Sequence, residues 1–247
     1  MIKIKNLSKT FGTKKVLEDI NLEIPSGEIT IIMGPSGCGK STLLRMLIGL
    51  EKPTSGEIWI DGQEISGMTE TQLNEVRKKM GMVFQYSALF DFLSVGENVA
   101  FGLRQHTSFS EDEIGKTVRR RLKMVGLDGS EHVMPAELSG GMKKRVSLAR
   151  AIAGNPSVVL YDEPTAGLDP IMSSVIDKLI IGCRDRLDIT SVVVTHDMDS
   201  AFKLADRMAM ISDGRVIEFG TPDQIKESAN SLVQQFIHGW LSPTLKK

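Results

Sequence analysis

The segment Gly34–Ser41 is the feature that most restricts how this chain can fold. Its letters, GPSGCGKS, fit the pattern G-x-x-x-x-G-K-[ST], in which glycines let a loop turn its backbone N–H groups toward phosphate oxygens. Such a loop needs a strand before it and a helix after it, because the helix N-terminus adds a positive dipole end to the cradle. The apolar run Glu28–Met33 and the helical composition of Ser41–Leu50 supply both.

The last residues of this loop have separate predicted roles. Lys40 can reach the β- and γ-phosphates of a nucleoside triphosphate, and the Ser41 hydroxyl can coordinate Mg²⁺. Cys38 lies inside the loop, so its oxidation is a hypothesis for blocking ATP. The residues expected to bind the nucleotide here are Gly34, Pro35, Ser36, Gly37, Cys38, Gly39, Lys40, Ser41 and Thr42.

A pair of acidic residues follows the apolar run Val158–Leu160. Asp162 and Glu163 stand at the end of this predicted strand, and α/β sheets bind ligands at the carboxyl ends of their strands. We expect Asp162 to hold Mg²⁺ through water and Glu163 to polarise the water that attacks the γ-phosphate. Two adjacent acids could instead simply end the strand in a turn, but the phosphate loop disfavours that interpretation.

Two further polar residues end apolar runs in the same way. His196 follows Val192–Thr195, where an imidazole can hydrogen-bond a γ-phosphate oxygen and orient the attacking water. Gln85 follows Met82–Phe84, and its neutral amide suits both Mg²⁺ and water. Each of these residues is ambiguous when taken alone, since a histidine that ends a strand is more often structural.

The serine-glycine loop Leu138–Met142 is a second candidate cradle. Its two glycines directly precede a helix rich in lysine and arginine, which makes another anion-binding helix N-terminus. One ATP does not need two such cradles from the same chain. Two chains arranged head to tail would use both, with each ATP between the phosphate loop of one chain and Ser139, Gly140 and Gly141 of the other.

The apolar pattern predicts an α/β nucleotide-binding core with a helical insertion. Residues 1–60 have the pattern of short strands and tight turns, and charged helices are predicted at Glu111–Val125 and Ser139–Ala153. From Ser157 onward, apolar runs alternate with helical stretches, which is typical of a parallel sheet. We expect the core and its β subdomain at 1–87 and 154–224, a helical subdomain at 88–153, and a C-terminal helical tail at 225–247.

Six ordered motifs make the chain resemble the ATPases of ABC transporters. They are the phosphate loop, Gln85, Leu138–Met142, the acidic strand end, Ala166–Asp169 and His196. The resemblance implies an α/β fold, with a P-loop NTPase (RecA-like) core, an antiparallel β subdomain and an inserted α-helical subdomain. It also implies hydrolysis of ATP with Mg²⁺, coupled to transport across a membrane.

The resemblance adds two residues to the site and reveals one departure. It implies that Phe11 stacks on adenine, at a position where tyrosine is commoner, and that Asp169 lies at a dimer interface and couples the two sites. The second cradle normally ends in glutamine, whereas this chain has Met142. The Ser139 hydroxyl and the glycine amides are unaffected, so we still expect contact with ATP.

Met142 also looks like the subgroup that serves MCE-type lipid transporters, the Mla intermembrane phospholipid systems. The stretches Gln85–Phe90, Glu97–Ala100 and Leu103–Thr107 are similar to the same subgroup. The partners implied are a second copy of the chain, integral membrane permease subunits, an MCE-domain lipid-binding protein and a small accessory protein.

The segment after Gln85 is where the membrane subunit of this family docks a short cytoplasmic helix. The side chains there form an apolar set that suits a helix-in-groove contact. The alternative is that they fill the core of the helical subdomain. The set consists of Ala88, Leu89, Phe90, Phe92 and Leu93.

The net charge and hydropathy of the chain limit the kinds of partner that it can have. A formal net charge of -1 argues against a nucleic-acid binder that relies on phosphate neutralisation. No apolar run approaches the ~18 residues that span a bilayer. If this chain acts at a membrane, another subunit is therefore expected to span it. The resemblance implies that the chain lies peripherally on the cytoplasmic face of the inner membrane. The widely separated Cys38 and Cys183 indicate a reducing compartment.

The densest basic cluster of the chain lies within a predicted helix. We interpret Arg119, Arg120, Arg121 and Lys123 as a solvated helix face.

The C-terminal stretch Ser231–Trp240 could pack on its own core, on the dimer partner or on a companion protein. Similarity to Mla-type tails slightly favours an inter-subunit role. Its apolar helical face comprises Leu232, Val233, Phe236, Ile237 and Trp240.

Two other functional classes stay open at this point. The transported cargo could be a polar amino acid, a lipoprotein or an ion, because cargo contacts lie in other subunits. The chain could also be a soluble ATP-gated regulator, although such proteins resemble tandem cassettes or carry long coiled-coil inserts, and neither feature occurs here.

Overall fold

The structure is a computed structural model that describes residues 1–241, with side chains described through Ile237. The chain forms two compact units, one of Met1–Leu73 with Val192–Lys247 and one of Asn74–Ser191. The predicted helical subdomain at 88–153 lies wholly inside the second unit. Residues 242–247 of the predicted tail and the side chain of Trp240 lie outside the described residues.

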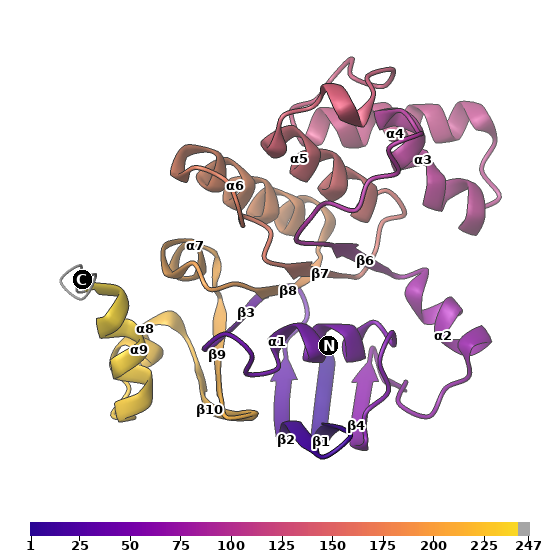
Figure 1. Cartoon of the computed structure of the whole chain (residues 1–247). Coiled ribbons are helices and arrows are strands. Elements are labelled where there is room, and N and C mark those ends of the chain that lie inside the picture. Colours follow the sequence, from indigo (N-terminus) through magenta and orange to yellow (C-terminus); the bar gives the residue numbers. More distant parts are fainter. Residues whose placement is uncertain (242–247) are drawn as a thin grey trace. The chain divides into compact units, whose positions relative to one another are not determined.

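The first unit begins with an antiparallel sheet in the order β2-β1-β4-β5, whose first three strands are labelled in Figure 1. Alternate side chains of β1 and β2, among them Ile2, Ile4 and Leu22, are buried, as the period of two in the sequence requires. The predicted antiparallel β subdomain is therefore confirmed. Its strands are β1 (Ile2–Phe11), β2 (Lys14–Ile24), β4 (Ser55–Ile60) and β5 (Gln63–Glu64).

The first unit also contains the strand–loop–helix segment that the phosphate loop predicts. All side chains of β3 (Ile29–Met33) are buried, as is typical of a strand inside a parallel sheet, and α1 (Lys40–Leu47) begins inside the loop motif. β3 pairs in parallel with β9, which in turn pairs antiparallel with β10. The remaining bounds are β8 (Thr190–Val194), which starts in the second unit, α7 (Met198–Leu204), β9 (Arg207–Ser212) and β10 (Arg215–Gly220).

The described part of the C-terminal stretch packs on its own chain. Helix α9 (Ser231–Leu241) follows α8 (Pro222–Lys226), and Figure 1 shows the two side by side. Val233 and Ile237 are 0% and 4% exposed, whereas Leu232 is 48% exposed. Of the three packing partners that the sequence leaves open, the chain's own core therefore covers at least this part of the helical face.

The second unit combines two parallel strands with a set of helices. β6 (Met80–Val83) pairs with β7 (Val158–Asp162), and α2 (Glu70–Arg77) leads into the unit. Ser94 and Ser110 each form a capping box with the glutamate three residues later. The box satisfies backbone N–H groups at the start of the helix and so fixes where the helix begins. The helices are α3 (Val95–His106), α4 (Glu111–Met124), the short 3₁₀ helix η1 (Pro135–Glu137), α5 (Gly140–Ala151) and α6 (Pro170–Leu187).

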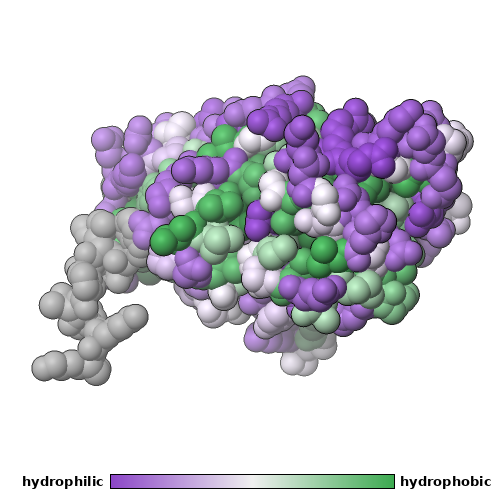
Figure 2. All heavy atoms as spheres, turned by 90° about the horizontal axis from the view of Figure 1, so that it is seen from above, coloured by the Kyte–Doolittle hydropathy of each residue, from purple (hydrophilic) through white to green (hydrophobic). Residues whose placement is uncertain are grey.

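The helical predictions for this unit are confirmed within a few residues at α4 and α5. Figure 2 shows hydrophilic and hydrophobic residues mixed over the face that it draws. Among the helices that the structure describes, none combines the length and the apolar character needed to cross a bilayer.

The interpretation of the basic cluster as a solvated face is wrong for one of its members. Arg121 is 2% exposed, and its guanidinium donates to the Asn155 side chain and to Met124 Sδ. Its position on α4 falls on the face that also buries Ile114 and Val118, so the helical period overrides the charge. Arg119, Arg120 and Lys123 are exposed as expected.

We expect Asn98→Ala to lower the free energy of unfolding by about 3 kcal/mol, because the buried amide bonds the main chain at Phe90, Leu93 and Ser94. The matched change Ser110→Ala, which removes one helix cap, should cost about 1 kcal/mol. Urea unfolding of the full chain followed by circular dichroism measures both. An Asn98→Ala loss no larger than that of Ser110→Ala would contradict the expectation.

Candidate functional site

The phosphate loop has the backbone geometry that only glycine accepts at two positions. A Cβ on Gly34, whose φ is +150°, would lie 2.0 Å from the carbonyl oxygen of Ile211 on β9. A Cβ on Gly39, at φ +104°, would lie 2.6 Å from Leu17 Cδ2 on β2. The loop is therefore held between β9 and β2.

Lys40 folds back over this loop. Its side chain is 8% exposed, and Nζ donates to the carbonyl oxygens of Gly34 (2.8 Å) and Pro35 (2.9 Å). The ammonium is thus already placed inside the cradle, where a phosphate oxygen could replace a carbonyl as its acceptor. Burial raises the pKa of the Cys38 thiol, although Lys40 Nζ at 3.9 Å acts in the opposite direction, so the reactive thiolate is disfavoured.

Phe11 lies at the end of β1, and the residue is 47% exposed. Lys9 Nζ sits 4.6 Å from the centre of that ring, a cation–π contact. Phe11 pairs with Lys14, and the next residues of that hairpin, Val16 and Leu17, are the ones that face Gly39. The first unit therefore brings an exposed aromatic ring onto the hairpin that backs the phosphate loop.

His196 also belongs to the first unit. It follows β8, where the Thr195 amide donates to the carbonyl of Ile32 at 3.4 Å, only two residues before Gly34. The imidazole is exposed. The structure thus places His196 at the end of the strand beside β3, on the edge of the sheet from which the phosphate loop departs.

The second unit brings Gln85 and the acidic pair to one edge of its strands. The ladder between β6 and β7 ends with Val83 opposite Tyr161. Because the strands are parallel, Gln85 and Glu163 each lie two residues beyond this last pair. Glu163 has a φ of +49°, the left-handed region that a non-glycine residue seldom adopts.

Lys144 joins these two strand ends and was missed by the sequence reasoning. Its side chain on α5 is 5% exposed and donates to the main-chain carbonyls of Gln85 and of Glu163, the latter at 3.3 Å. Burial lowers the pKa of Lys144, while the carboxylates of Glu163 and Asp162 act in the opposite direction. The available signal was its spacing, since Gly141, Lys144 and Leu148 share one buried face of the helix.

The segment after Gln85 is fixed by hydrogen bonds from Arg150 to its main chain. Arg150 Nη1 and Nη2 donate to the carbonyls of Ala88 (2.6 Å) and Ser87 (2.9 Å). Phe92 is 77% exposed, and none of the five apolar side chains proposed either to dock a partner or to fill the core is buried. Leu89, Phe90 and Leu93 are half-buried, and the Phe90 ring lies 4.7 Å from that of Phe101 on α3. Core filling therefore accounts for part of the set at most, and docking of a partner stays a prediction.

The serine-glycine loop and Asp169 lie at two neighbouring helix starts. Ser139 caps α5 by accepting from the Met142 amide at 3.3 Å, and Asp169 caps α6 by accepting from the Ile171 and Met172 amides. A Cβ on Gly141 would lie 2.5 Å from Met172 Cε, so the two helices meet closely there. Ser139, Gly140 and Asp169 are exposed, which leaves their polar groups accessible.

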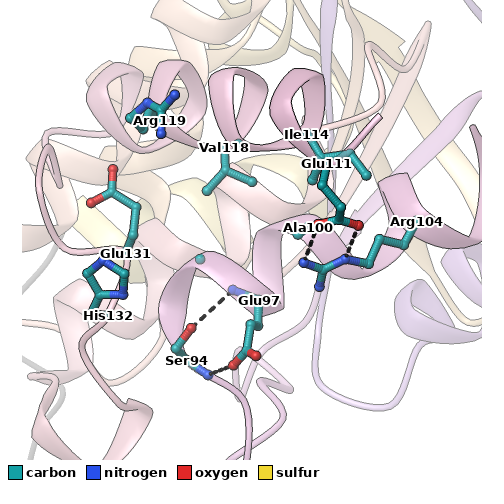
Figure 3. Close-up of a pocket in the computed structure, with 12 residues that line it drawn as sticks. Ser94, Glu97, Ala100, Arg104, Glu111, Ile114, Val118, Arg119, Glu131 and His132 are labelled. Atoms are coloured by element: carbon teal, nitrogen blue, oxygen red, sulfur yellow. Dashed lines mark hydrogen bonds and ion pairs between the residues drawn. The ribbon is translucent and has the colours of Figure 1, made fainter. Parts of the chain in front are cut away.

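A cavity of about 630 Å³ lies elsewhere in the second unit, between α3 and α4 (Figure 3). Arg104 and Glu111 close one end of it with two bonds of 2.9 Å, and Arg119, Glu131 and His132 lie around the other. None of the residues predicted to carry chemistry lines this cavity. It is therefore separate from the candidate site.

The predicted site residues are thus distributed over both units. The first contains Phe11, Gly34, Pro35, Ser36, Gly37, Cys38, Gly39, Lys40, Ser41, Thr42 and His196, and the second contains Gln85, Ser139, Gly140, Gly141, Asp162, Glu163 and Asp169. Within the described residues no cluster of three or more His, Cys, Asp or Glu side chains forms a cage for a metal. A serine, an amide and one carboxylate are hard oxygen donors that suit Mg²⁺ when phosphates supply further ligands.

Known proteins are similar to this chain over most of its length. A family model described as "ABC transporter" matches residues 17–166. Over 239 residues the chain is 45% identical to the "Intermembrane phospholipid transport system ATP-binding protein MlaF" of Haemophilus influenzae, covering 97% of this chain and 90% of that protein. It is 41% identical over 238 residues to the "Probable ribonucleotide transport ATP-binding protein mkl" of Mycobacterium leprae, covering 96% and 69%.

Solved structures agree in fold. A dimeric ATP-binding cassette in a post-hydrolysis state with ADP and Pi is 37% identical, with a TM-score of 0.82 over 90% of this chain and 99% of that one. The cbiO1 protein of Clostridium perfringens is 35% identical, with a TM-score of 0.85 over 96% and 94%. With a family match over more than half its length, this chain belongs to the ATP-binding, ATP-hydrolysing family of ABC transporter subunits.

Proposed function

We propose that this chain hydrolyses ATP to energise phospholipid transport between bacterial membranes, as the ATPase subunit of an Mla/MCE-type transporter. The observation that carries the lipid cargo is the 45% identity, over nearly the whole chain, to an ATP-binding protein named for intermembrane phospholipid transport. Met142 and the segment after Gln85 support the same subgroup. The chain would work on the cytoplasmic face of the inner membrane.

The proposed partners follow from the same comparison and from the surface of the second unit. A second copy of the chain would supply Ser139, Gly140 and Gly141 to each nucleotide, and a solved relative of this fold is a dimer. A permease helix would dock on the exposed segment that Arg150 holds after Gln85. An MCE-domain protein and a small accessory protein would complete the transporter.

The proposed mechanism assigns each residue a task. Lys40 and the loop amides hold the phosphates, and Phe11 stacks on adenine. Ser41, Gln85 and water held by Asp162 would bind Mg²⁺, and the metal would supply positive charge to balance that of the transferred phosphoryl group. Glu163 takes a proton from the attacking water, and His196 orients that water. Closure around two ATP molecules and reopening after hydrolysis would drive the membrane subunits, with Asp169 between the two sites.

The cargo is tested by purifying the full chain with its membrane partners from the native host. We expect mass spectrometry to detect an MCE-domain protein, a multi-span permease and bound phospholipid. A ribonucleotide cargo is the second candidate, since the mycobacterial relative carries that name. Recovery of a soluble receptor for nucleotides or amino acids, without phospholipid, would overturn the lipid assignment, and ribosomes without membrane partners would point to a regulator.

Glu163→Gln should leave ATP binding intact while turnover falls by about a hundredfold or more, because the amide cannot accept the proton. Phosphate release and fluorescent-nucleotide binding measure the two properties. The control is Glu75→Gln, which removes an exposed carboxylate paired with Lys78. Turnover of Glu163→Gln within about tenfold of the unchanged protein would contradict the role of Glu163.

Lys40→Met should weaken ATP binding by at least about tenfold, because the phosphates lose a buried cationic donor. The matched control, Arg45→Met, removes a charge from the exposed side of the same helix and should change the affinity by less than about twofold. Equilibrium binding of a fluorescent ATP analogue measures both. Equal effects of the two changes would show that the loop does not bind phosphate through Lys40.

Mild peroxide should leave ATP binding unchanged, because burial raises the pKa of the Cys38 thiol and keeps it protonated at neutral pH. The measurement is nucleotide affinity before and after treatment. A loss of affinity that dithiothreitol reverses would support the oxidation hypothesis instead.

A further inference from the structure

The buried ammonium of Lys144 has a place in the molecule that no proposed role yet explains. Its side chain is 5% exposed and donates to two main-chain carbonyls, those of Gln85 and Glu163. Moving a cation out of water is costly unless hydrogen bonds compensate for the loss of hydration. The two hydrogen bonds to Gln85 and Glu163 therefore compensate for the burial of this charge, and they fix the main chain at both residues.

The two carbonyls belong to residues that lie beyond the last hydrogen-bonded pair of β6 and β7. The last paired residues of β6 and β7 are Val83 and Tyr161. Beyond them, the main chains must separate to form two different loops. Lys144 joins these two loops by hydrogen bonds to the main chain of Gln85 and of Glu163.

The main chain at Glu163 needs such support. Its φ of +49° costs about 1–2 kcal/mol for a residue with a Cβ. The carbonyl of Glu163 accepts from the Ala166 amide at 3.2 Å as well as from Lys144. Two donors thus hold the peptide that sets the direction of the Glu163 carboxylate.

A second cation on the same helix reinforces the arrangement. Arg150 donates to the carbonyls of Ser87 and Ala88, so α5 holds the segment 85–88 at both ends. The first residue of α5 follows Ser139, whose hydroxyl caps the helix. One rigid helix therefore connects the serine-glycine loop to both strand ends.

We propose that Lys144 is a positioning residue for ATP hydrolysis, which fixes the main chain of Gln85 and Glu163 from the helix that begins at Ser139. The role rests on the proposed function, in which Glu163 and Gln85 act on the water and Mg²⁺. It implies that a movement of the serine-glycine loop on nucleotide closure is passed by α5 to the reacting strand ends.

The test uses the purified full chain with three substitutions. Lys144→Met removes the donor and keeps most of the side-chain length, Lys144→Arg keeps a cationic donor, and Lys143→Met removes the neighbouring charge on the same helix. MgATP titrations give kcat and KM, and amide hydrogen exchange without nucleotide reports on the segments 84–88 and 163–166. If Lys144→Met aggregates, the neutral and shorter Lys144→Gln takes its place with the same expected direction.

We expect Lys144→Met to lower kcat by at least about tenfold and to change KM by less than about threefold, because binding is retained while the reacting groups lose their alignment. Exchange in both segments should be faster in this variant. Lys144→Arg should restore kcat to within about threefold, since a cationic donor is again present. Lys143→Met should behave as the unchanged protein in every measurement.

The proposal is overturned by an unchanged kcat in Lys144→Met, by unchanged exchange in both segments, or by Lys144→Arg performing no better than Lys144→Met. Glu163→Gln, assayed in parallel, separates this proposal from the proposed function. Full turnover in Glu163→Gln would show that the catalytic assignment is wrong. An inactive Glu163→Gln beside a fully active Lys144→Met would show that only the role of Lys144 is wrong.

Discussion

The first unit depends on a close approach between backbones at the phosphate loop. Gly34 leaves no room for a side chain against the Ile211 carbonyl, and Gly39 leaves none against Leu17. This steric limit ties the loop to β9 on one side and to the β1–β2 hairpin on the other. Lys40 adds two hydrogen bonds to carbonyl oxygens of the same loop, those of Gly34 and Pro35. Backbone contacts within the chain therefore define the shape of the cradle.

In the second unit, two cations of α5, the buried Lys144 and the half-buried Arg150, hold main-chain carbonyls in a comparable way. Lys144 and Arg150 reach from α5 to the loops that follow β6 and β7, where the ladder can no longer hold the chain. Asn98 performs the same function for the segment from Phe90 to Ser94 with a neutral amide. Polar side chains therefore place the loops that are proposed to act on nucleotide and on the membrane subunit.

Much of the fold could be predicted because its signals are local. The glycine pattern at Gly34–Ser41 permits few surroundings other than a strand and a helix, and β3 and α1 are there. The apolar pattern likewise predicted α4 and α5 within a few residues of their bounds. Arg121 was misjudged, because its buried position depends on what packs against α4, and a run of charged letters carries no information about that.

The sequence by itself determined the family, the order of the motifs and the residue types available for phosphate, Mg²⁺ and water. Those follow from short-range rules of backbone conformation and ligand chemistry. Only the tertiary structure decided that α9 packs on its own chain through Val233 and Ile237, and that Lys144 joins Gln85 to Glu163. These contacts link residues far apart in the chain, so their energies depend on packing that no local pattern specifies.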